Sequence, residues 1–227
     1  MPEFDCSFLL TDGNRVLLRG KRNCSVSLWQ IEAYGKIYGE SLVLATGAHY
    51  AAYTGARRRP LWSLRATSRG PGKVAQYNER RQKVASPAVT GHIGEAMALP
   101  ALCAMLPPDS SLGFVRLHGR QGRGPDYLTN APDALWRLFD LEVPSLPPTV
   151  PMEVRARIGF DQRYPRSAEA PLKAYWRECL RSGLNDRLRY GVVARVNLSS
   201  GGDQSSAIRF YLFVPDVVYD MATGGPN

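Results

Sequence analysis

The order of helix-like and strand-like segments between residues 91 and 214 constrains the fold of this chain more than any other feature. A run rich in Ala, Leu and Met starts at Gly91 and stops before Pro107-Pro108, where a helix cannot easily continue. We expect Pro100 to kink or split this helix. Strand-like runs follow at residues 112–118, 126–128 and 150–158.

A second helix and two more strands complete this order. Apolar residues recur at i, i+3, i+4, i+7 and i+8, which predicts a helix with one apolar face, made of Leu172, Tyr175, Trp176, Cys179 and Leu180. The other face carries Lys173, Arg177, Glu178 and Arg181. Gly183 is a suitable helix end. Residues 190–198 and 208–214 are β-rich and flank a turn signal at 199–203, so we predict an α/β protein with a mixed sheet.

Two carboxylates and a cation occupy related positions in the predicted strands. Asp126 follows Gly124-Pro125 and opens a short apolar run, whereas Glu153 and Arg155 alternate within the run 150–158. Residues i and i+2 of a strand point to the same face, so Glu153 and Arg155 project together, beside Asp126 if the two strands pair. Two carboxylates suit Mg²⁺ or Mn²⁺, which prefer hard oxygen ligands.

Pro125-Asp126 and Glu153-Val154-Arg155 resemble the two halves of the PD-(D/E)xK motif. Together with the order of elements, they make a little over half of the chain similar to the PD-(D/E)xK nuclease superfamily. The resemblance implies a restriction-endonuclease-like αβββαβ core and phosphodiester hydrolysis with Mg²⁺ or Mn²⁺ held by Asp126 and Glu153. Many members also carry a Glu on the first core helix, and Glu95 is the matching position, as a further metal or catalytic residue.

Arg155 stands where this family has lysine. Lysine can lose its proton when its pKa is depressed, but arginine in practice cannot, so Arg155 cannot act as a general base. It can still position a phosphate or offset charge in the transition state. Three possibilities stay open: the enzyme works with arginine, another lysine takes over, or the site is inactive. The candidate lysines are Lys73, Lys83 and Lys173.

Each acidic residue also has a purely structural interpretation. Glu95 could favour the dipole of a helix N-terminus. Asp126 could be a turn residue after Gly-Pro. Glu153 could form a salt bridge with Arg155 or Arg157, because a buried carboxylate is costly unless it is paired or bound to metal.

A rival motif pairs Pro132-Asp133 with Glu142. At the position where a basic residue would have to follow Glu142, however, the chain carries Pro144. We therefore favour Asp126 with Glu153. The Pro-rich stretch after Val143 separates the two motif halves and is predicted to form a loop at the rim of the site, where target recognition often resides.

Positive charge is concentrated in the N-terminal part. The formal net charge is +9, of which residues 1–90 contribute +8 and residues 91–227 only +1. Between residues 57 and 83, aromatic Trp62 and Tyr77 lie among nine basic residues: Arg57, Arg58, Arg59, Arg65, Arg69, Lys73, Arg80, Arg81 and Lys83. Such a segment suits a nucleic-acid backbone with bases stacked on the aromatics. A solvated loop or an acidic protein partner would also explain the charge.

The remaining composition excludes several classes of site. The four cysteines form no CxxC pair and the three histidines have no ligand spacing, which argues against zinc. No signal peptide or apolar stretch of membrane-spanning length is visible. We therefore expect a cytoplasmic protein with reduced thiols and no membrane partner.

Residues 1–90 are predicted to be a β-rich, basic region and residues 91–227 the nuclease-like core. Asp12-Gly13 between apolar runs predicts a hairpin, and residues 25–31 and 41–46 are candidate strands. This region either extends the core sheet or forms a separate module.

The leading functional hypothesis is a Mg²⁺-dependent endonuclease that acts on DNA rather than RNA, in bacterial defence, restriction or mobile-element processing. The setting is an association with the fold. The second hypothesis is a catalytically inactive nucleic-acid-binding subunit of a larger complex, which Arg155 favours. The third is an assembly protein that binds an acidic partner. A homodimer and a partner subunit both stay open.

Overall fold

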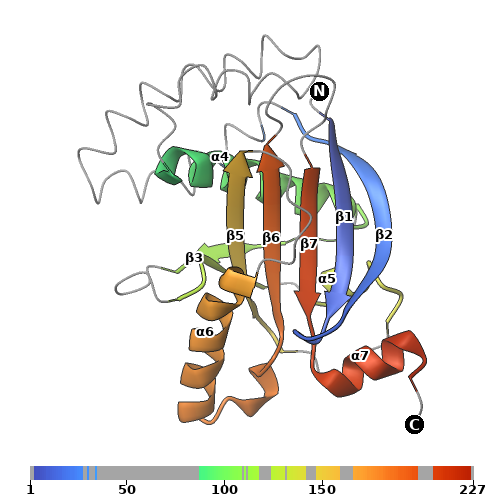
Figure 1. Cartoon of the computed structure of the whole chain (residues 1–227), viewed down its shortest axis with the longest axis vertical. Coiled ribbons are helices and arrows are strands. Elements are labelled where there is room, and N and C mark those ends of the chain that lie inside the picture. Colours follow the sequence, from blue (N-terminus) through green and yellow to red (C-terminus); the bar gives the residue numbers. More distant parts are fainter. Residues whose placement is uncertain are drawn as a thin grey trace.

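The described residues form a mixed α/β structure built on one seven-stranded sheet (Figure 1). The computed structural model describes residues 3–27, 30, 34, 87–108, 110, 112–117, 124–130, 132–141, 147–158, 166–198 and 207–225. Strands follow the order β2-β1-β7-β6-β5-β4-β3 across the sheet. The predicted α/β class with a mixed sheet is therefore confirmed.

The strands are β1 (Glu3–Thr11), β2 (Val16–Ser25), β3 (Phe114–Arg116), β4 (Tyr127–Thr129), β5 (Val150–Ile158), β6 (Gly191–Leu198) and β7 (Ala207–Phe213). The helices are α4 (Pro87–Met105), α5 (Pro132–Trp136), α6 (Glu169–Arg181) and α7 (Asp216–Thr223), with 3₁₀ turns η2 (Arg166–Ala168) and η3 (Asn185–Arg187). β3, β4 and β5 form an antiparallel meander, and β6 returns parallel to β5 after α6. β7 lies antiparallel to β6.

The predicted strands between residues 112 and 214 are all present, although β3 is shorter than expected. Pro100 was expected to kink or split the first helix, and the split was wrong, because α4 runs through Pro100 as one helix. A proline removes only one N–H from the helix ladder. Its neighbours Leu99, Ala101 and Leu102 are completely buried, so packing against the sheet keeps the helix intact.

The predicted hairpin is also present, because β1 and β2 pair antiparallel around Asp12-Gly13. β1 then pairs in parallel with β7, so the hairpin extends the sheet that carries β5 and β6. Of the predicted strand at 25–31, only Ser25 lies in a strand, as the last residue of β2, and the other described residues contradict the prediction. Ser27 and Gln30 exchange the hydrogen bonds of a capping box, which starts a helix instead.

Several other predictions lie outside the described residues, namely the candidate strand at 41–46, the turn at 199–203 and the nine basic residues between 57 and 83. The division of the chain at residue 90 also stays a prediction.

Helices cover the two faces of the sheet (Figure 1). α4 packs on one face so closely that Gly94 has no room for a side chain, since an added Cβ would lie 2.3 Å from the Cβ of Ala156 on β5. On the other face, Leu172 of α6 packs with Val193, Tyr211 and Phe213.

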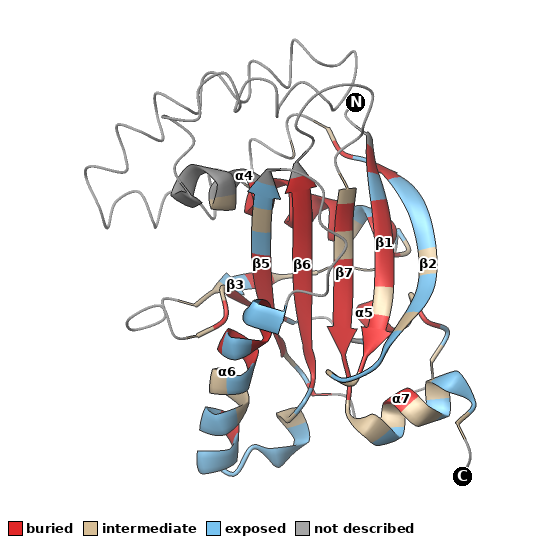
Figure 2. Ribbon diagram, viewed as in Figure 1, coloured by how far each residue is buried: buried red, intermediate tan, exposed pale blue. Residues whose placement is uncertain are grey.

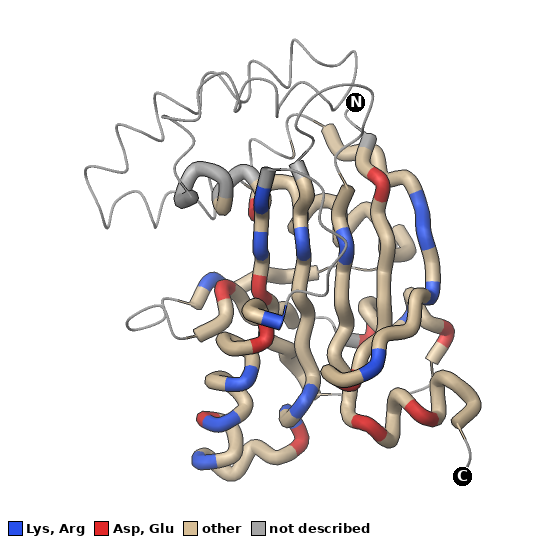
Figure 3. The backbone as a smooth tube through the Cα atoms, in the orientation of Figure 1, with Lys and Arg blue, Asp and Glu red and all other residues tan. Residues whose placement is uncertain are grey.

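The helix pattern predicted α6 well. Lys173, Arg177, Glu178 and Arg181 are exposed. Figure 2 shows exposed stretches along α6, and Figure 3 shows charged residues along the same helix. One of the predicted apolar contacts is wrong, because 59% of Leu180 is exposed. Gly183, with φ of 74°, follows the last turn as expected.

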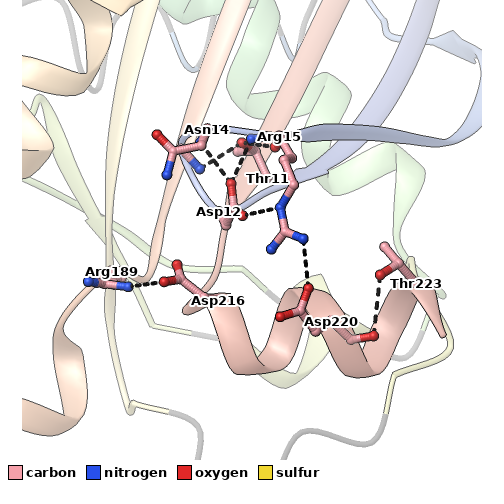
Figure 4. Close-up of polar contacts among 9 residues, drawn as sticks. Thr11, Asp12, Asn14, Arg15, Arg189, Asp216, Asp220 and Thr223 are labelled. Atoms are coloured by element: carbon pink, nitrogen blue, oxygen red, sulfur yellow. Dashed lines mark hydrogen bonds and ion pairs between the residues drawn. The ribbon is translucent and has the colours of Figure 1, made fainter. Parts of the chain in front are cut away.

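Helix α7, which the sequence patterns did not predict, lies against the hairpin that joins β1 and β2 (Figure 4). Arg15 forms one ion pair with Asp12 of the hairpin at 2.7 Å and another with Asp220 of α7 at 2.8 Å. Its guanidinium also lies 4.6 Å from the ring centre of Tyr219. These contacts fix the end of the chain to the first hairpin. Within the described ranges, no helix combines the length and apolar character needed to cross a membrane.

Candidate functional site

The candidate site lies where β4 separates from β5. The two strands pair only through Tyr127–Thr129 and Val150–Met152, whereas β5 continues to Ile158. Asp126 directly precedes β4. Beyond the last paired residues of β4 and β5, its side chain bonds to β5 instead: Oδ2 of its carboxylate accepts the N–H of Val154 at 2.9 Å. Its backbone carbonyl accepts the Leu117 N–H, also at 2.9 Å. Asp126 is therefore held from both neighbouring strands.

Glu153 lies next to this contact and is almost completely enclosed, with 2% of its side chain exposed. Its Oε1 lies 2.6 Å from Nη2 of Arg155, whose side chain is 53% exposed. Its other oxygen, Oε2, is buried and makes no hydrogen bond with any part of the chain that the structure describes. A buried carboxylate oxygen without a donor is costly, so this atom marks an incomplete environment.

The two carboxylates make each other harder to ionise. Burial raises the pKa of Glu153 to about 8, and the nearby Asp126 adds to the rise, while Arg155 opposes it. Burial also raises the pKa of Asp126; the Val154 N–H opposes the rise and the Glu95 carboxylate adds to it. The pair therefore retains a proton near neutral pH, which a cation bound between the carboxylates would displace.

Glu95 approaches the site from α4 and is held through one of its carboxylate oxygens. Its Oε2 accepts Nη1 of Arg116 at 2.9 Å and the hydroxyl of Tyr127 at 2.6 Å. Nη1 of Arg116 also donates to the hydroxyl oxygen of Tyr127 at 3.0 Å. Burial, together with the Glu95 charge, raises the pKa of the Tyr127 phenol, so this hydroxyl remains a hydrogen-bond donor. The Glu95 charge also acts on Asp126.

The structure thus brings all four predicted site residues together: Glu95 from α4, Asp126 before β4, and Glu153 and Arg155 from β5. The helix-dipole interpretation of Glu95 was wrong, because α4 begins at Pro87 and carries no acidic residue in its first turn. The salt bridge between Glu153 and Arg155 is present and leaves Oε2 unsatisfied.

Sequence reasoning missed Arg116 and Tyr127. A signal for Arg116 existed, because it lies two residues after Phe114, in phase with the buried face of a predicted strand. The register places Arg116 opposite Tyr127, which follows Asp126 in the chain. A charged residue in phase with a buried face, opposite a motif residue, was the available clue.

The rival motif residues and the candidate lysines lie in different parts of the chain, and some of them are outside the described residues. Asp133 lies exposed on α5, and Glu142, its proposed partner, is outside the described residues. Lys173 forms an ion pair with Glu169 at 2.6 Å on α6. Lys73 and Lys83, like the other seven basic residues between 57 and 83, belong to the undescribed part.

The candidate site offers a divalent cation only a few protein ligands. Among the described residues, no group of three or more His, Cys, Asp or Glu side chains is arranged to hold a metal ion. Mg²⁺, however, is often bound through one or two carboxylates together with water and substrate phosphate. The neighbouring carboxylates of Asp126 and Glu153, with one buried oxygen of Glu153 that lacks a partner among the described residues, fit that donor set.

Comparisons with protein-family models, with curated proteins and with solved structures find no match to this chain. Inference about its activity therefore depends on the site itself.

Proposed function

We propose that this protein is a Mg²⁺- or Mn²⁺-dependent nuclease of the PD-(D/E)xK type, with α4, β3, β4, β5, α6 and β6 as its restriction-endonuclease-like core. One observation carries the proposal. Asp126 and Glu153 meet in a buried position where Oε2 of Glu153 has no hydrogen-bond partner, beside the half-exposed guanidinium of Arg155. Such a site is ready to accept a hard cation and a phosphate.

In this proposal, Asp126, Glu153 and Arg155 have separate roles. Asp126 and Glu153 would hold the cation, with Asp126 oriented by its bond to the Val154 N–H. A bound Mg²⁺ or Mn²⁺ supplies a water of lowered pKa and offsets the charge of the scissile phosphate. Arg155 is exposed enough to contact that phosphate and stabilise the developing charge, but it cannot accept the proton of the water.

Glu95 has a different part in this proposal. Its Oε2 accepts from both Arg116 and Tyr127, and its charge raises the pKa of Asp126. We assign it to the site as a positioning residue.

The expected substrate is DNA rather than RNA, and the setting we propose is bacterial defence, restriction or mobile-element processing. The test is cleavage of supercoiled plasmid, single-stranded DNA and RNA with Mg²⁺, Mn²⁺ or EDTA. Asp126→Asn and Glu153→Gln should each lower the rate by about 100-fold or more, since each removes a charge from the cation site. Glu178→Gln, on the exposed face of α6, is the matched control and should cleave normally. Cleavage that survives both site variants, or that proceeds in EDTA, would refute the proposal.

One observation favours the second candidate, an inactive nucleic-acid-binding subunit. Arg155 already forms a 2.6 Å ion pair with Glu153, which offsets a charge that the cation would need. In that case the wild-type protein binds nucleic acid without cutting it. Arg155→Lys separates the two candidates, because a lysine can lose its proton and restore the family motif. Cleavage gained by this variant alone would identify a site inactivated by arginine.

A further inference from the structure

A hollow of about 570 Å³ lies between β2, the end of α4 and the segment that follows α5. α4 crosses the sheet from β5, where Gly94 lies against Ala156, to β2, where Arg22 donates to the carbonyl of Met105 at 2.7 Å (Figure 1). A hollow of this size is in the range of sites that enclose small organic molecules, roughly 300–1,000 Å³. Its described lining residues include none of the candidate site residues.

Positive charge dominates the lining of this hollow. Three arginines contribute to it, two from β2 and one from the segment after α5: Arg19, Arg22 and Arg137. Asp140 is the one carboxylate among the described lining residues. Three arginines less one aspartate give the lining a formal charge of +2. All four residues are exposed, so their charged groups are accessible to a ligand.

A β-bulge in β2 brings Arg19 and Arg22 to the same hollow. Residues three apart in a regular strand point to opposite faces of the sheet. The register of β1 with β2 shifts after Phe8, which pairs with Gly20, and the shift skips Arg19. Bulges redirect side chains and are frequent next to functional sites. The bulge therefore lets two arginines converge that a regular strand would separate.

Backbone carbonyls, rather than carboxylates, hold these two arginines. Arg22 donates to Met105, the last residue of α4, and Arg19 donates to Ala222 near the end of α7. Each contact stabilises a helix C-terminus but uses only one of the five N–H donors of a guanidinium. Within the described residues, neither arginine forms an ion pair with a carboxylate. Their side chains are thus positioned while their positive charges are not neutralised.

The rest of the described lining is apolar and partly aromatic. Phe8 and Phe139 contribute two rings whose centres lie 5.5 Å apart, edge to face. Gly20 leaves room for the ring of Phe8, because an added Cβ would collide with it. A ligand with an apolar body would contact this wall while its anionic group meets the arginines. The hollow therefore suits an organic anion better than an inorganic ion.

We propose that this hollow binds a small phosphate-bearing organic molecule of about the size of a nucleotide. A phosphate monoester carries close to two negative charges at neutral pH, which balances the formal charge of the lining. Its oxygens accept from several guanidinium donors, whose planar fork fits phosphate. The inference does not rest on the nuclease function, because the hollow and the Asp126–Glu153 site share no described residue.

The test is isothermal titration calorimetry of the full chain in EDTA, which keeps divalent cations away from the candidate site. The probes are AMP, UMP and ribose 5-phosphate, and citrate is the carboxylate comparison. At least one phosphate ester should bind saturably. Arg19→Gln/Arg22→Gln should weaken this binding by about 100-fold, which is about tenfold for each lost charge-assisted contact. Both glutamines keep an N–H donor for the carbonyls of Ala222 and Met105.

Two further variants separate a binding site from a general effect of charge or folding. Lys21→Gln/Arg177→Gln removes the same total charge from exposed positions outside the lining and should change affinity less than about twofold. Asp140→Asn should strengthen binding by about two- to fivefold, because it removes the opposing charge. Asparagine tolerates the left-handed backbone at this position, where φ is 52°. A gain in affinity cannot result from misfolding.

Each outcome either supports or overturns the proposal. Saturable binding of a phosphate ester that requires the two arginines and improves in Asp140→Asn would support it. The absence of saturable binding by all three esters, equal losses in the Lys21→Gln/Arg177→Gln control, or weaker binding in Asp140→Asn would overturn it. Tighter binding of citrate, or binding of single-stranded DNA without binding of any ester, would assign the arginines to another ligand and overturn it. None of these results depends on metal-dependent cleavage.

Discussion

Glu95 and Glu153 are two buried glutamates, each paired with an arginine, and their environments differ in completeness. Glu95 receives both Arg116 and the Tyr127 hydroxyl on one oxygen, and the side chain of Arg116 is only 10% exposed. Glu153 is paired through one oxygen with the half-exposed Arg155, while its other oxygen has no partner within the described residues. A satisfied buried ion pair serves structure, whereas an unsatisfied carboxylate with a raised pKa is typical of a site completed by a ligand.

The largest expected difference between the two glutamates is in the loss of stability when the arginine partner of each is replaced. Arg116→Met should lower the free energy of unfolding by about 3–5 kcal/mol, because it leaves the Glu95 charge buried without its cation. Arg155→Met should cost about 1 kcal/mol or less, since that side chain is half exposed. Urea unfolding at pH 7 measures both. Equal costs for the two variants would contradict the distinction between the two glutamates.

The second difference concerns pH. The folded pKa of Glu153 is about 8, above its ordinary value of 4.5. The folded state therefore binds an additional proton between these values, so the contribution of this group to stability is complete below pH 4.5 and is lost as pH rises through 8. Glu153→Gln should remove this loss and be more stable than the wild type at pH 9, by on the order of a few kcal/mol.

Urea unfolding at pH 5, 7 and 9 checks this expectation. Glu95→Gln is the comparison variant and should be less stable than the wild type at each pH, because an amide accepts weaker bonds from Arg116 and Tyr127. A gain at pH 9 in Glu95→Gln, or no gain in Glu153→Gln, would reverse the roles that we assign to the two residues.

The smallest expected effect is stabilisation by a cation. Mn²⁺ at about 100 times its dissociation constant should stabilise the wild type by about 3 kcal/mol, a shift in melting temperature of roughly 5–10 °C. The shift should grow between pH 6 and 9, because Glu153 must release its proton to bind. Thermal scans should show no shift for Glu153→Gln or Asp126→Asn and most of it for Glu95→Gln. A full loss in Glu95→Gln would make Glu95 a direct ligand.

The pattern of local signals explains what could be predicted. Alternation within an apolar run predicted β5 with its observed bounds and placed Glu153 and Arg155 together. A proline before Asp126, at a strand start, indicated the second carboxylate. These residues are recognisable because their own neighbours in the chain define their geometry.

The missed features depend on contacts between distant segments. Arg116 and Tyr127 reach Glu95 only through the pairing of β3 with β4 and the packing of α4 on the sheet. The expected split at Pro100 was wrong for the same reason, because burial of its neighbours outweighs the propensity of a single residue.

The parallel pairing of β1 with β7 has a consequence for how the protein is assembled. Asp5–Thr11 lie beside Ala207–Phe213, so the sheet joins segments about 200 residues apart at this pair of strands. The candidate site instead gathers residues between 95 and 155, from segments much closer in the chain. Pairings between distant segments form slowly because a long loop must close first. We therefore expect the meander that holds Asp126 and Glu153 to form early during folding, and the first hairpin to join the sheet last.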